Sequence, residues 1–371
     1  MGKTMRAIGI MSGTSMDGID VAEITTDGEE RVAHGATLSV AYDADFRARL
    51  AQAVADARAL TDRRARTPLL AAVEAELTEQ HARAVGRLLE ENAIAARHIA
   101  VIGFHGHTVL HAPERRLTVQ IGDGARLARL TGIDVVCDMR AADCAAGGQG
   151  APLAPVYHRA LAAAVRERPI AFVNIGGVAN VTWIGASGRL LAFDTGPGNA
   201  LIDDFVRLRQ GLAFDAEGAL AARGGVSEDH VRHYLCHPYF GAPPPKSLDR
   251  NAFALQAVAT LSPADGAATL TAVTAAGIAR AREHFPEPAA LWIVAGGGRR
   301  NRTLMAMLAE RIEALVVPAE ALGIDGAALE AEAWAYLAVR ALRRLPLSFP
   351  GTTGVAAPLT GGVLCPAGSA A

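Results

Sequence analysis

The residues best suited to bind phosphate lie in a glycine-rich turn between two apolar stretches near the N-terminus, Ile8–Ile10 and Ile19–Ala22. Glycine lets a backbone approach an anion closely, and hydroxyl groups can donate to phosphate oxygens. Asp17 and Asp20 could hold a divalent cation through their carboxylates. The pattern predicts a strand, a tight turn and a second strand. Taken alone, such a turn is more often a plain hairpin than an anion site, and a partial echo of it further along the chain favours the anion site. The hydroxyl-bearing residues of the turn are Ser12, Thr14 and Ser15.

A second glycine turn, Asn174–Gly177, lies near the middle of the chain and follows an apolar stretch that begins at Phe172. The alternating residues Val178–Trp183 come next, and such alternation is typical of a strand. Two half-chains that each open with a glycine hairpin predict a duplicated fold. We expect the two hairpins to face each other across a cleft between two domains.

Asp194 is the carboxylate best placed to act as a general base. It ends an apolar stretch that begins at Leu190, and a Thr-Gly-Pro-Gly turn and a predicted helix follow it. A carboxylate at a strand end, beside a helix N-terminus, is well placed to take a proton near a bound phosphate. The alternative is an Asx turn, in which the carboxylate only hydrogen bonds to its own backbone.

Two further predicted strands lead directly into polar or glycine-rich segments. Ile99–Phe104 leads into His105-Gly-His-Thr-Val-Leu-His111, and ligands bind at the carboxyl ends of such strands. No carboxylate or cysteine completes a familiar metal spacing here, so hydrogen bonding to a ligand or to the turn is favoured over a metal site. Leu291–Ala295 leads into Gly296-Gly-Gly298, which either cradles a nucleotide or lets a strand and a helix pack closely.

Three other segments each allow two interpretations. The glycine-rich stretch Arg140–Pro152 predicts a binding loop or a crossover between domains, or else a flexible linker. The proline-rich stretch Gly241–Ser247 excludes a helix and either holds Lys246 in place or serves only as a spacer. Glu330 lies near the start of a long predicted helix, where it faces either a cleft or solvent.

Length and composition limit the classes of protein to which the chain can belong. A chain of 371 residues exceeds what one hydrophobic core usually serves, so two domains are expected. The 36 Lys and Arg nearly balance the 38 Asp and Glu, which predicts no long-range attraction to nucleic acid. No apolar run is long enough to span a membrane, and the start does not resemble a signal peptide. Four cysteines without zinc-like or disulfide-rich spacing favour a reducing cytoplasm.

Ordered motifs run through the chain, and nearly end to end they resemble the anhydro-N-acetylmuramic acid kinase family of the actin, hexokinase and heat-shock-cognate superfamily. The motifs are Gly9-Ile-Met-Ser-Gly-Thr-Ser-Met-Asp-Gly-Ile-Asp20, His105-Gly-His-Thr-Val-Leu-His-Ala-Pro113, Gln120-Ile-Gly-Asp-Gly124, Ala145-Ala-Gly-Gly-Gln-Gly-Ala-Pro-Leu153, Asn174-Ile-Gly-Gly177 and Phe193-Asp-Thr-Gly-Pro-Gly-Asn199. The resemblance implies an α/β, two-domain actin-like ATPase (ribonuclease H-like) fold with a central interdomain cleft. It implies a first domain of residues 1–130, with a tail of about 346–371 packing back on it, and a second domain of residues 131–345.

The resemblance also implies an activity. The chain would be an ATP-dependent kinase that converts 1,6-anhydro-N-acetylmuramic acid and water to N-acetylmuramic acid 6-phosphate in peptidoglycan recycling, with Asp194 as the catalytic base. The implied partners are this sugar and ATP, without nucleic acid or membrane, in a cytoplasmic homodimer, and Mg²⁺ is expected at Asp17 and Asp20. The implied nucleotide-binding residues are Gly13, Thr14, Ser15, Met16, Asp17, Gly18, Ile19, Asp20, Gly176, Gly177, Gly296, Gly297, Gly298 and Asn301, and the implied substrate-binding residues are His105, Gln120, Asp123, Gln149 and Glu330.

The chain departs from the family pattern in two places. Leu248–Asn251 stands where the family usually has Thr-Gly-Arg-Glu, and His107 replaces a more usual glutamine. Neither change falls on Asp194 or on the phosphate turns. Two other interpretations stay open: another sugar kinase of the same superfamily, and a non-catalytic sensor or filament-forming nucleotide binder.

Overall fold

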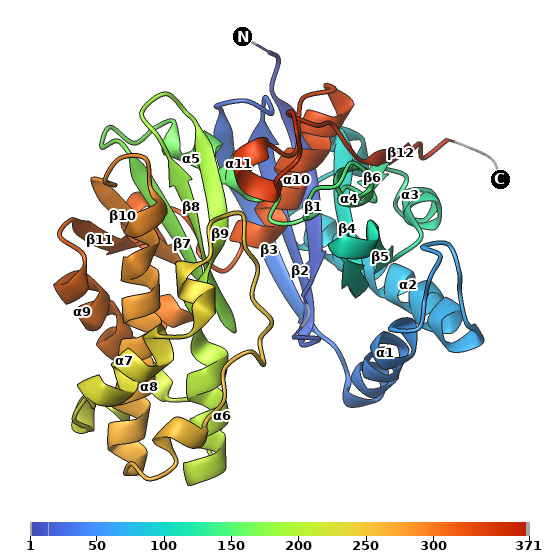
Figure 1. Ribbon diagram of the computed structural model, residues 1–371. Helices are drawn as coiled ribbons and strands as arrows, with labels where there is room; N and C mark the ends of the chain where they lie inside the picture. Colours follow the sequence, from blue (N-terminus) through green and yellow to red (C-terminus); the bar gives the residue numbers. More distant parts are fainter. Residues whose placement is uncertain (1, 14, 369–371) are drawn as a thin grey trace. The chain divides into compact units, whose positions relative to one another are not determined.

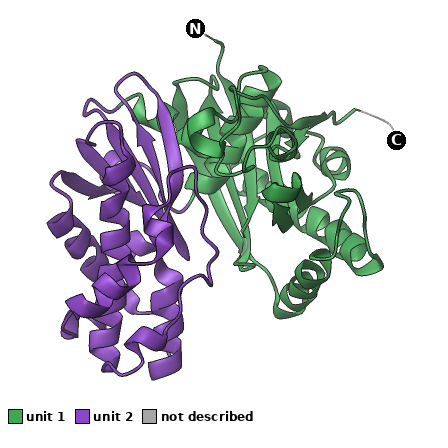
Figure 2. Ribbon diagram, viewed as in Figure 1, with its two compact units in different colours: residues 1–164, 328–371 green, residues 165–327 purple. Residues whose placement is uncertain are grey.

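The chain folds into two compact units, each with a β-sheet and packed helices (Figures 1 and 2). Unit 1 comprises residues 1–164 and 328–371, and unit 2 comprises residues 165–327. The computed structural model describes residues 2–13 and 15–368. Thr14, one of the predicted nucleotide-binding residues, therefore lies outside the described residues.

Within its described residues, unit 1 contains a seven-stranded sheet in the order β12-β6-β4-β1-β2-β3, with β5 paired to β4. β1, β2 and β3 pair antiparallel, whereas β4 is parallel to β1 and β6 is parallel to β4. The strands are β1 Met5–Ser12, β2 Gly18–Thr26, β3 Val32–Ala41, β4 Val101–Ala112, β5 Leu117–Ile121, β6 Val135–Cys137 and β12 Val363–Cys365. The α-helices are α1 Ala44–Ala57, α2 Pro68–Glu91, α3 Gly124–Thr131, α4 Ala141–Ala145, α5 Pro155–Ala162, α10 Leu329–Leu342 and α11 Pro350–Thr353.

Unit 2 repeats this strand order in a five-stranded sheet, β11-β10-β7-β8-β9, over the described residues. β7, β8 and β9 pair antiparallel, whereas β10 is parallel to β7 and β11 is parallel to β10. The strands are β7 Ile170–Ile175, β8 Val178–Ile184, β9 Leu190–Pro197, β10 Leu291–Ala295 and β11 Leu315–Pro318. The α-helices are α6 Asn199–Gln210, α7 Glu228–Leu235, α8 Pro263–Arg280 and α9 Arg302–Arg311.

The two sheets are copies of one topology. Three antiparallel strands followed by two parallel ones occur in both, so β7, β8, β9, β10 and β11 correspond to β1, β2, β3, β4 and β6. Each copy opens with the glycine hairpin that the sequence analysis identified. The duplicated α/β fold of the two-domain actin-like class is therefore confirmed. The cleft between the two units stays a prediction.

Helix α10 packs directly on the centre of the unit 1 sheet because two glycines leave room for its backbone. A Cβ atom at Gly9 of β1 would lie 1.8 Å from the carbonyl oxygen of Ala331. A Cβ atom at Gly103 of β4 would lie 2.0 Å from the carbonyl oxygen of Trp334. Any larger residue would push the helix off the sheet, since atoms in a protein interior are already close-packed. This close packing fixes the first turn of α10, which carries Glu330.

The boundaries between the units differ from the expected ones. Residues 131–164 and 328–345 were expected in the second domain, but they belong to unit 1. The cause is long-range strand pairing and packing, because β6 pairs with β4 and β12, and α10 packs on β1, β2 and β4. The expected boundaries at residues 131 and 345 are therefore corrected to 165 and 327.

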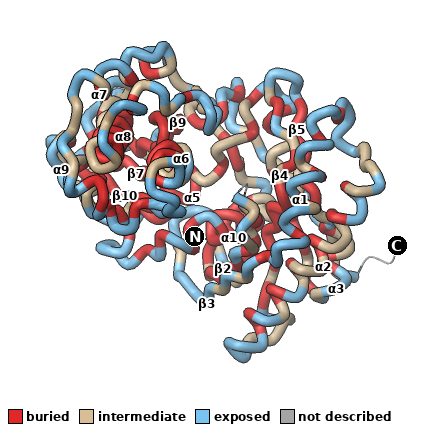
Figure 3. Tube along the Cα trace, turned by 90° about the horizontal axis from the view of Figure 1, so that it is seen from below, coloured by how far each residue is buried: buried red, intermediate tan, exposed pale blue. Residues whose placement is uncertain are grey.

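Each unit has its own core. In unit 1, buried side chains of the sheet pack against buried side chains of α1 and α2, such as Phe46 on α1 and Leu77 on α2. In unit 2, α8 is rich in Ala and Thr and is buried along most of its length, so that it contacts α6, α7 and α9 closely (Figure 3). Within residues 2–13 and 15–368, the structure contains no helix that is long and apolar enough to cross a membrane.

Candidate active site

Asp194 lies inside strand β9 rather than at its end, which corrects the sequence-based placement. It sits opposite Asn180 of β8, and the register between the strands shifts at the next pair, Ala179 with Gly196. Thr195 is therefore an additional residue on β9, as in a β-bulge, and bulges re-aim side chains beside active sites. β7, β9 and β10 run in the same direction, so the ends of these strands meet at one edge of the sheet.

The Asp194 carboxyl is partly buried and holds one hydrogen bond from the backbone. The N–H of Leu248 donates to Oδ2 at 2.8 Å, and in the described part of the chain Oδ1 accepts no hydrogen bond. Burial raises the pKa of Asp194 to about 6, while the Leu248 N–H acts in the opposite direction because it stabilises the charged form. The carboxylate is thus mostly ionised at neutral pH, with one oxygen available to take a proton.

The second glycine hairpin holds the start of helix α6. The carbonyl oxygen of Gly177 accepts from the N–H groups of Gly198 and Ala200, and that of Gly176 accepts from the N–H of Asn199 at 2.8 Å. The hairpin thereby satisfies N–H groups that a helix N-terminus leaves without partners. Gly177 itself is exposed, and a nucleotide-binding role for Gly176 and Gly177 stays a prediction.

Three glycines follow β10 at the same sheet edge, and close packing requires two of them, Gly296 and Gly298. A Cβ atom at Gly296 would lie 2.4 Å from Oδ1 of Asn174, and one at Gly298 would lie 2.4 Å from Cγ2 of Ile175. Gly297–Arg300 forms a short 3-10 helix, after which Asn301 caps α9 by accepting from the N–H of Leu304 at 2.9 Å. Close packing is therefore established for Gly296 and Gly298, and a nucleotide-binding role stays a prediction for Gly296, Gly297, Gly298 and Asn301.

The first glycine turn closes tightly between β1 and β2. The N–H of Met16 donates to the carbonyl oxygen of Gly13 at 3.0 Å, and Met16 has a left-handed φ of 55°. The hydroxyl of Ser15 donates to Oδ1 of Asp17 at 2.7 Å. Ile19 points into the core of unit 1, so a ligand contact from Ile19 can come only from its backbone. A Cβ atom at Gly18 would lie 2.3 Å from the carbonyl oxygen of Val40, which explains the glycine there.

Asp17 and Asp20 form an exposed pair of carboxylates at this turn. Oδ1 of Asp20 accepts a hydrogen bond from the hydroxyl of Ser39 at 2.5 Å. Although Asp20 is exposed, desolvation of its carboxyl by neighbouring atoms raises its pKa, and the charge of Asp17 raises it further. A divalent cation would relieve this repulsion, and carboxylate oxygens are the donors that Mg²⁺ prefers. The described residues hold no group of three or more His, Cys, Asp and Glu suited to a metal, so such a cation would need phosphate oxygens and water as further ligands.

His107, one of the departures from the family pattern, is buried next to the first turn. The hydroxyl of Tyr42 donates to Oγ of Ser12 at 2.8 Å, and Ser12 Oγ lies 3.0 Å from Nδ1 of His107. Burial lowers the pKa of His107 to about 4, so the ring is neutral at pH 7 and its Nδ1 can accept from Ser12. The three side chains therefore link the connection after β3 to β1 and β4, next to the first glycine turn.

His105 holds an arginine that the sequence analysis did not assign to the site. Nδ1 of His105 donates to the carbonyl oxygen of Gly106 at 2.9 Å, and Nε2 accepts from Nε of Arg140 at 3.2 Å. Both nitrogens are thus engaged within unit 1, and burial, followed by the charge of Arg140, lowers the pKa of His105 well below its usual range. The ring also stacks on Trp334, with 4.5 Å between the ring centroids.

Arg140 itself carries the charge on this side of unit 1. Its guanidinium carbon lies 4.9 Å from the ring centroid of Trp334, and Nη1 donates to the carbonyl oxygen of Gly150 at 3.0 Å. Burial lowers its pKa to about 10, and the charge of Glu330 acts in the opposite direction. Arg140 thus stays a cation at neutral pH and faces the acidic first turn of α10. The sequence signal that could have assigned Arg140 to the site is its place at the start of a glycine-rich stretch.

The other expected substrate-binding residues lie in different surroundings. Nε2 of Gln120 donates to Thr118 at 2.8 Å and to Thr108 at 3.2 Å, whereas its buried Oε1 accepts nothing among the described residues. Asp123 caps α3 by accepting from the N–H of Arg126 at 2.9 Å, which is a structural role. Gln149 is held by its backbone, which donates to the carbonyl oxygen of Thr353 at 2.7 Å.

The glycine-rich stretch around Gln149 is an ordered loop, not a flexible linker. The buried carboxylate of Asp143 accepts from the N–H of Gly150 at 2.6 Å through Oδ1. Its Oδ2 accepts from the hydroxyl of Thr353 at 2.7 Å. Both carboxylate oxygens therefore fasten the loop to α4 and α11 inside unit 1.

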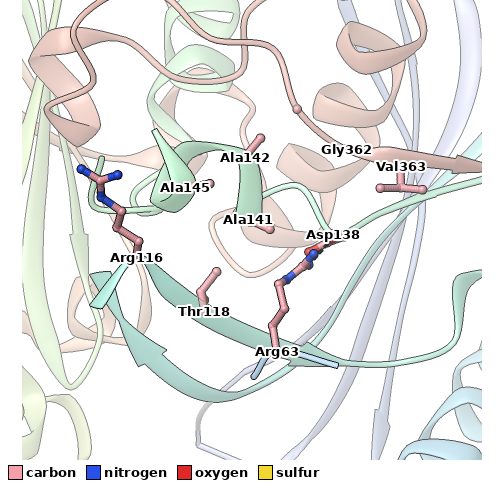
Figure 4. A pocket seen from close by; sticks show the side chains of 10 residues that line it. Arg63, Arg116, Thr118, Asp138, Ala141, Ala142, Ala145, Gly362 and Val363 are labelled. Atoms are coloured by element: carbon pink, nitrogen blue, oxygen red, sulfur yellow. Dashed lines mark hydrogen bonds and ion pairs between the residues drawn. The ribbon is translucent and has the colours of Figure 1, made fainter. Parts of the chain in front are cut away.

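A separate cavity of about 320 Å³ lies beside α4 in unit 1 (Figure 4). Arg63, which pairs with Asp138, and Arg116 contribute its charged lining, and Ala141, Ala145 and Val363 contribute apolar lining. None of the predicted site residues lines it. The candidate site residues of each unit therefore lie outside this cavity.

Comparison with known proteins identifies relatives over nearly the whole chain. Residues 5–367 match the family model described as anhydro-N-acetylmuramic acid kinase. A protein of that name from Methylobacterium nodulans is 54% identical, with 97% of this chain and 99% of the relative covered. A second one, from Agrobacterium fabrum, is 52% identical, with 98% and 99% covered. Among solved structures, a ROK family glucokinase from Streptomyces griseus in complex with glucose and AMPPNP is 15% identical, with 91% of this chain and 99% of that chain covered and a TM-score of 0.44.

Proposed function

The chain belongs to the anhydro-N-acetylmuramic acid kinase family, and from this premise we propose that it converts 1,6-anhydro-N-acetylmuramic acid, water and ATP to N-acetylmuramic acid 6-phosphate and ADP. In the anhydro sugar, O6 is an ether oxygen without a proton. It can accept a phosphoryl group only when its bond to C1 breaks. Water must therefore add to C1 while O6 attacks the γ-phosphorus, so that ring opening and phosphoryl transfer are coupled.

The observation that carries this proposal is the state of Asp194. Its Oδ2 is held by the Leu248 N–H at 2.8 Å, and burial raises its pKa to about 6. A base of this pKa is ionised at neutral pH and still takes a proton readily. We propose that Asp194 takes one proton from the water as its oxygen bonds to C1. The electron pair of the C1–O6 bond then passes to O6, which displaces ADP from the γ-phosphoryl group.

Backbone groups at both glycine hairpins support the proposed nucleotide binding. The tight turn that the Met16 N–H closes on Gly13 and the exposed Gly177 lie at hairpins between strands, and glycine turns of this kind commonly bind phosphate. We propose that the first turn takes the transferring phosphates, and that Gly176, Gly177 and Gly296–Gly298 lie along the nucleotide.

The sugar is proposed to bind where unit 1 gathers the half-buried polar side chains of Arg140 and Gln120 near the exposed Glu330. Arg140 offers a fixed cation for an anionic lactyl group, and its guanidinium is already oriented by His105 and Trp334. The buried Oε1 of Gln120 accepts no hydrogen bond among the described residues and suits a sugar hydroxyl. Glu330, on the first turn of α10, interacts with the charge of Arg140 and is proposed to orient the sugar.

Asp17 and Asp20 fit the Mg²⁺ that ATP-dependent kinases use, because both offer carboxylate oxygens and their charges repel each other. When bound, Mg²⁺ would neutralise charge on the phosphates that the first turn holds. A cytoplasmic location, favoured by the four free cysteines, and a homodimer stay further proposals. The exposed apolar side chains Leu208, Leu212 and Phe214 favour the homodimer, and light scattering of the purified protein tests it.

The experiment that tests the function combines a substrate panel with one substitution. ADP release is measured with 1,6-anhydro-N-acetylmuramic acid, N-acetylmuramic acid and glucose. We expect turnover with the anhydro sugar and a fall in kcat of about 10²- to 10⁴-fold in Asp194→Asn, with nucleotide and sugar affinities by calorimetry little changed. Asp203→Asn is a matched control, because burial also raises the pKa of Asp203 to about 6 but the residue lies on α6. Near-normal kcat in Asp194→Asn would move the base elsewhere, and preference for an unbridged sugar would indicate another sugar kinase.

A further inference from the structure

The segment Pro243–Asn251, which includes the departure from the family pattern at Leu248–Asn251, lies against the proposed catalytic base. Asp194 donates its backbone N–H to the carbonyl oxygen of Lys246 at 3.1 Å. Two residues further along the segment, the N–H of Leu248 donates to the carboxylate of Asp194 at 2.8 Å. The segment therefore holds both the backbone and the side chain of Asp194, and the position of the Leu248 N–H depends on how firmly the segment is fixed.

The side chain of Lys246 supplies that fixation. Its ammonium donates to the carbonyl oxygens of Tyr239 at 3.1 Å and Phe240 at 3.3 Å, and it lies 3.3 Å from Nε2 of His284. It also lies over the rings of Tyr239, at 4.8 Å, and Phe193, at 5.6 Å. An ammonium has three N–H groups, so these three partners use all of them. Lys246 is thereby turned toward the protein and not toward a ligand.

The composition of the chain gives separate support. Lys3 and Lys246 are its two lysines, against 34 arginines, because Lys and Arg together number 36. The chain thus uses arginine almost wherever a cation is needed, yet it has lysine at this position. A compact ammonium with three diverging donors fits three separate acceptors, whereas the planar fork of arginine fits paired oxygens.

We propose that Lys246 is a positioning residue for Asp194, one that fastens the segment Pro243–Asn251 to the 3-10 helix Pro238–Gly241 and to His284, so that the Leu248 N–H stays on the carboxylate. The proposal rests on the role of Asp194 in the proposed function. Tyr239 belongs to the same assembly, because its hydroxyl donates to the carbonyl oxygen of Asp194 at 2.6 Å.

The proposal predicts a change in pH dependence. The Leu248 N–H lowers the pKa of Asp194 against the effect of burial, so its loss raises this pKa. The titratable groups that face this assembly are Tyr239, whose pKa is raised by burial and by Asp194, and His284, whose pKa is lowered by burial and by Lys246. Tyr239 therefore stays protonated at neutral pH. The charges of Arg280 and Glu283 also act on both Lys246 and His284, in opposite directions. The acid limb of the pH profile of kcat/KM then reports the ionisation of Asp194. The variant His284→Gln checks that this limb does not come from the ionisation of His284.

The test uses Lys246→Met in the full chain, which keeps the length of the side chain and removes its donors. We expect the acid limb of kcat/KM for the sugar to move up by about one pH unit, because one hydrogen bond to the carboxylate is lost. The KM for ATP and the calorimetric affinity for nucleotide should stay within about twofold. Lys246→Arg should show a smaller shift, and Lys3→Met, the same change at the other, exposed lysine, should show none.

A readout independent of turnover separates this proposal from the proposed function. The pKa of Asp194 can be measured directly by NMR of ¹³C-labelled aspartate, with the signal assigned through Asp194→Asn. A raised pKa in Lys246→Met supports the positioning role even if the wild-type protein shows no turnover with the anhydro sugar, which would count against the proposed function alone. An unshifted pKa and an unshifted acid limb in a folded Lys246→Met protein overturn the proposal. A large rise in the KM for ATP with an unshifted limb overturns it as well, because it assigns Lys246 to the nucleotide.

Discussion

Arg140 donates a hydrogen bond from Nε to Nε2 of His105 over 3.2 Å, so residues from two separate motifs act as one group. The histidine was expected to bind the substrate directly. Both of its ring nitrogens are instead engaged within unit 1, which leaves the guanidinium as the charged group presented by this pair. We therefore expect Arg140, and not His105, to determine the affinity for the sugar.

Arg140→Met should raise the KM for the sugar by about 10- to 100-fold, the range expected when a hydrogen bond between charged groups is lost. The KM for ATP should change little. Steady-state kinetics with each substrate varied in turn checks this expectation. His105→Gln is the matched comparison and should have a smaller effect, because an amide oxygen can still accept from Arg140. If Arg140→Met lowers only the melting temperature and leaves the sugar KM unchanged, the arginine is a structural residue.

Asp20→Asn should weaken the response to Mg²⁺. The substitution removes one of two neighbouring carboxylates whose charges repel each other, so less negative charge is available to a divalent cation. We expect the Mg²⁺ concentration for half-maximal activity to rise by about tenfold, with kcat recovered at high Mg²⁺. A titration of activity against Mg²⁺ at saturating ATP measures it. Asp45→Asn, at an exposed position on α1, is the control, and an unchanged Mg²⁺ requirement in Asp20→Asn would remove Asp20 from the metal site.

His107 should make the protein sensitive to acid. Its folded-state pKa of about 4 lies below the usual 6.5, so the unfolded chain binds more protons than the folded one between these values. The stabilising contribution is complete above pH 6.5 and is lost as the pH falls toward 4. Between pH 7 and pH 5, His107→Gln should therefore lose about 2 kcal/mol less of its free energy of unfolding than the wild type. Urea unfolding at the two pH values measures this, and His98→Gln, at an exposed position, should behave like the wild type.

Local patterns predicted much of the fold and the chemical class of the site. The two glycine hairpins identified the duplication because each lies between strands that pair with their sequence neighbours. Asp194 could be selected because it follows an apolar strand pattern and precedes a glycine turn. Such signals act over a few residues, so a sequence shows them directly.

Features that depend on distant pairing could not be predicted in the same way. β6 belongs to unit 1 because Val135 pairs with Ile102, 33 positions earlier, and no local pattern encodes this pairing. The contact between Leu248 and Asp194 joins residues 54 positions apart through a backbone N–H, which every non-proline residue has. The placement of Asp194 within β9 depends on a bulge that only the strand register reveals.

The coupling of water addition and phosphoryl transfer through Asp194 is tested most directly by running the reaction with the anhydro sugar in ¹⁸O-labelled water. Mass spectrometry, with fragmentation to locate the label, is applied to the product at early times, before exchange at C1. We expect one ¹⁸O atom at C1, none in the phosphoryl group, and one ADP for each labelled sugar. Product with unlabelled C1, or efficient phosphorylation of unbridged N-acetylmuramic acid without any need for the anhydro bridge, would contradict the coupled reaction.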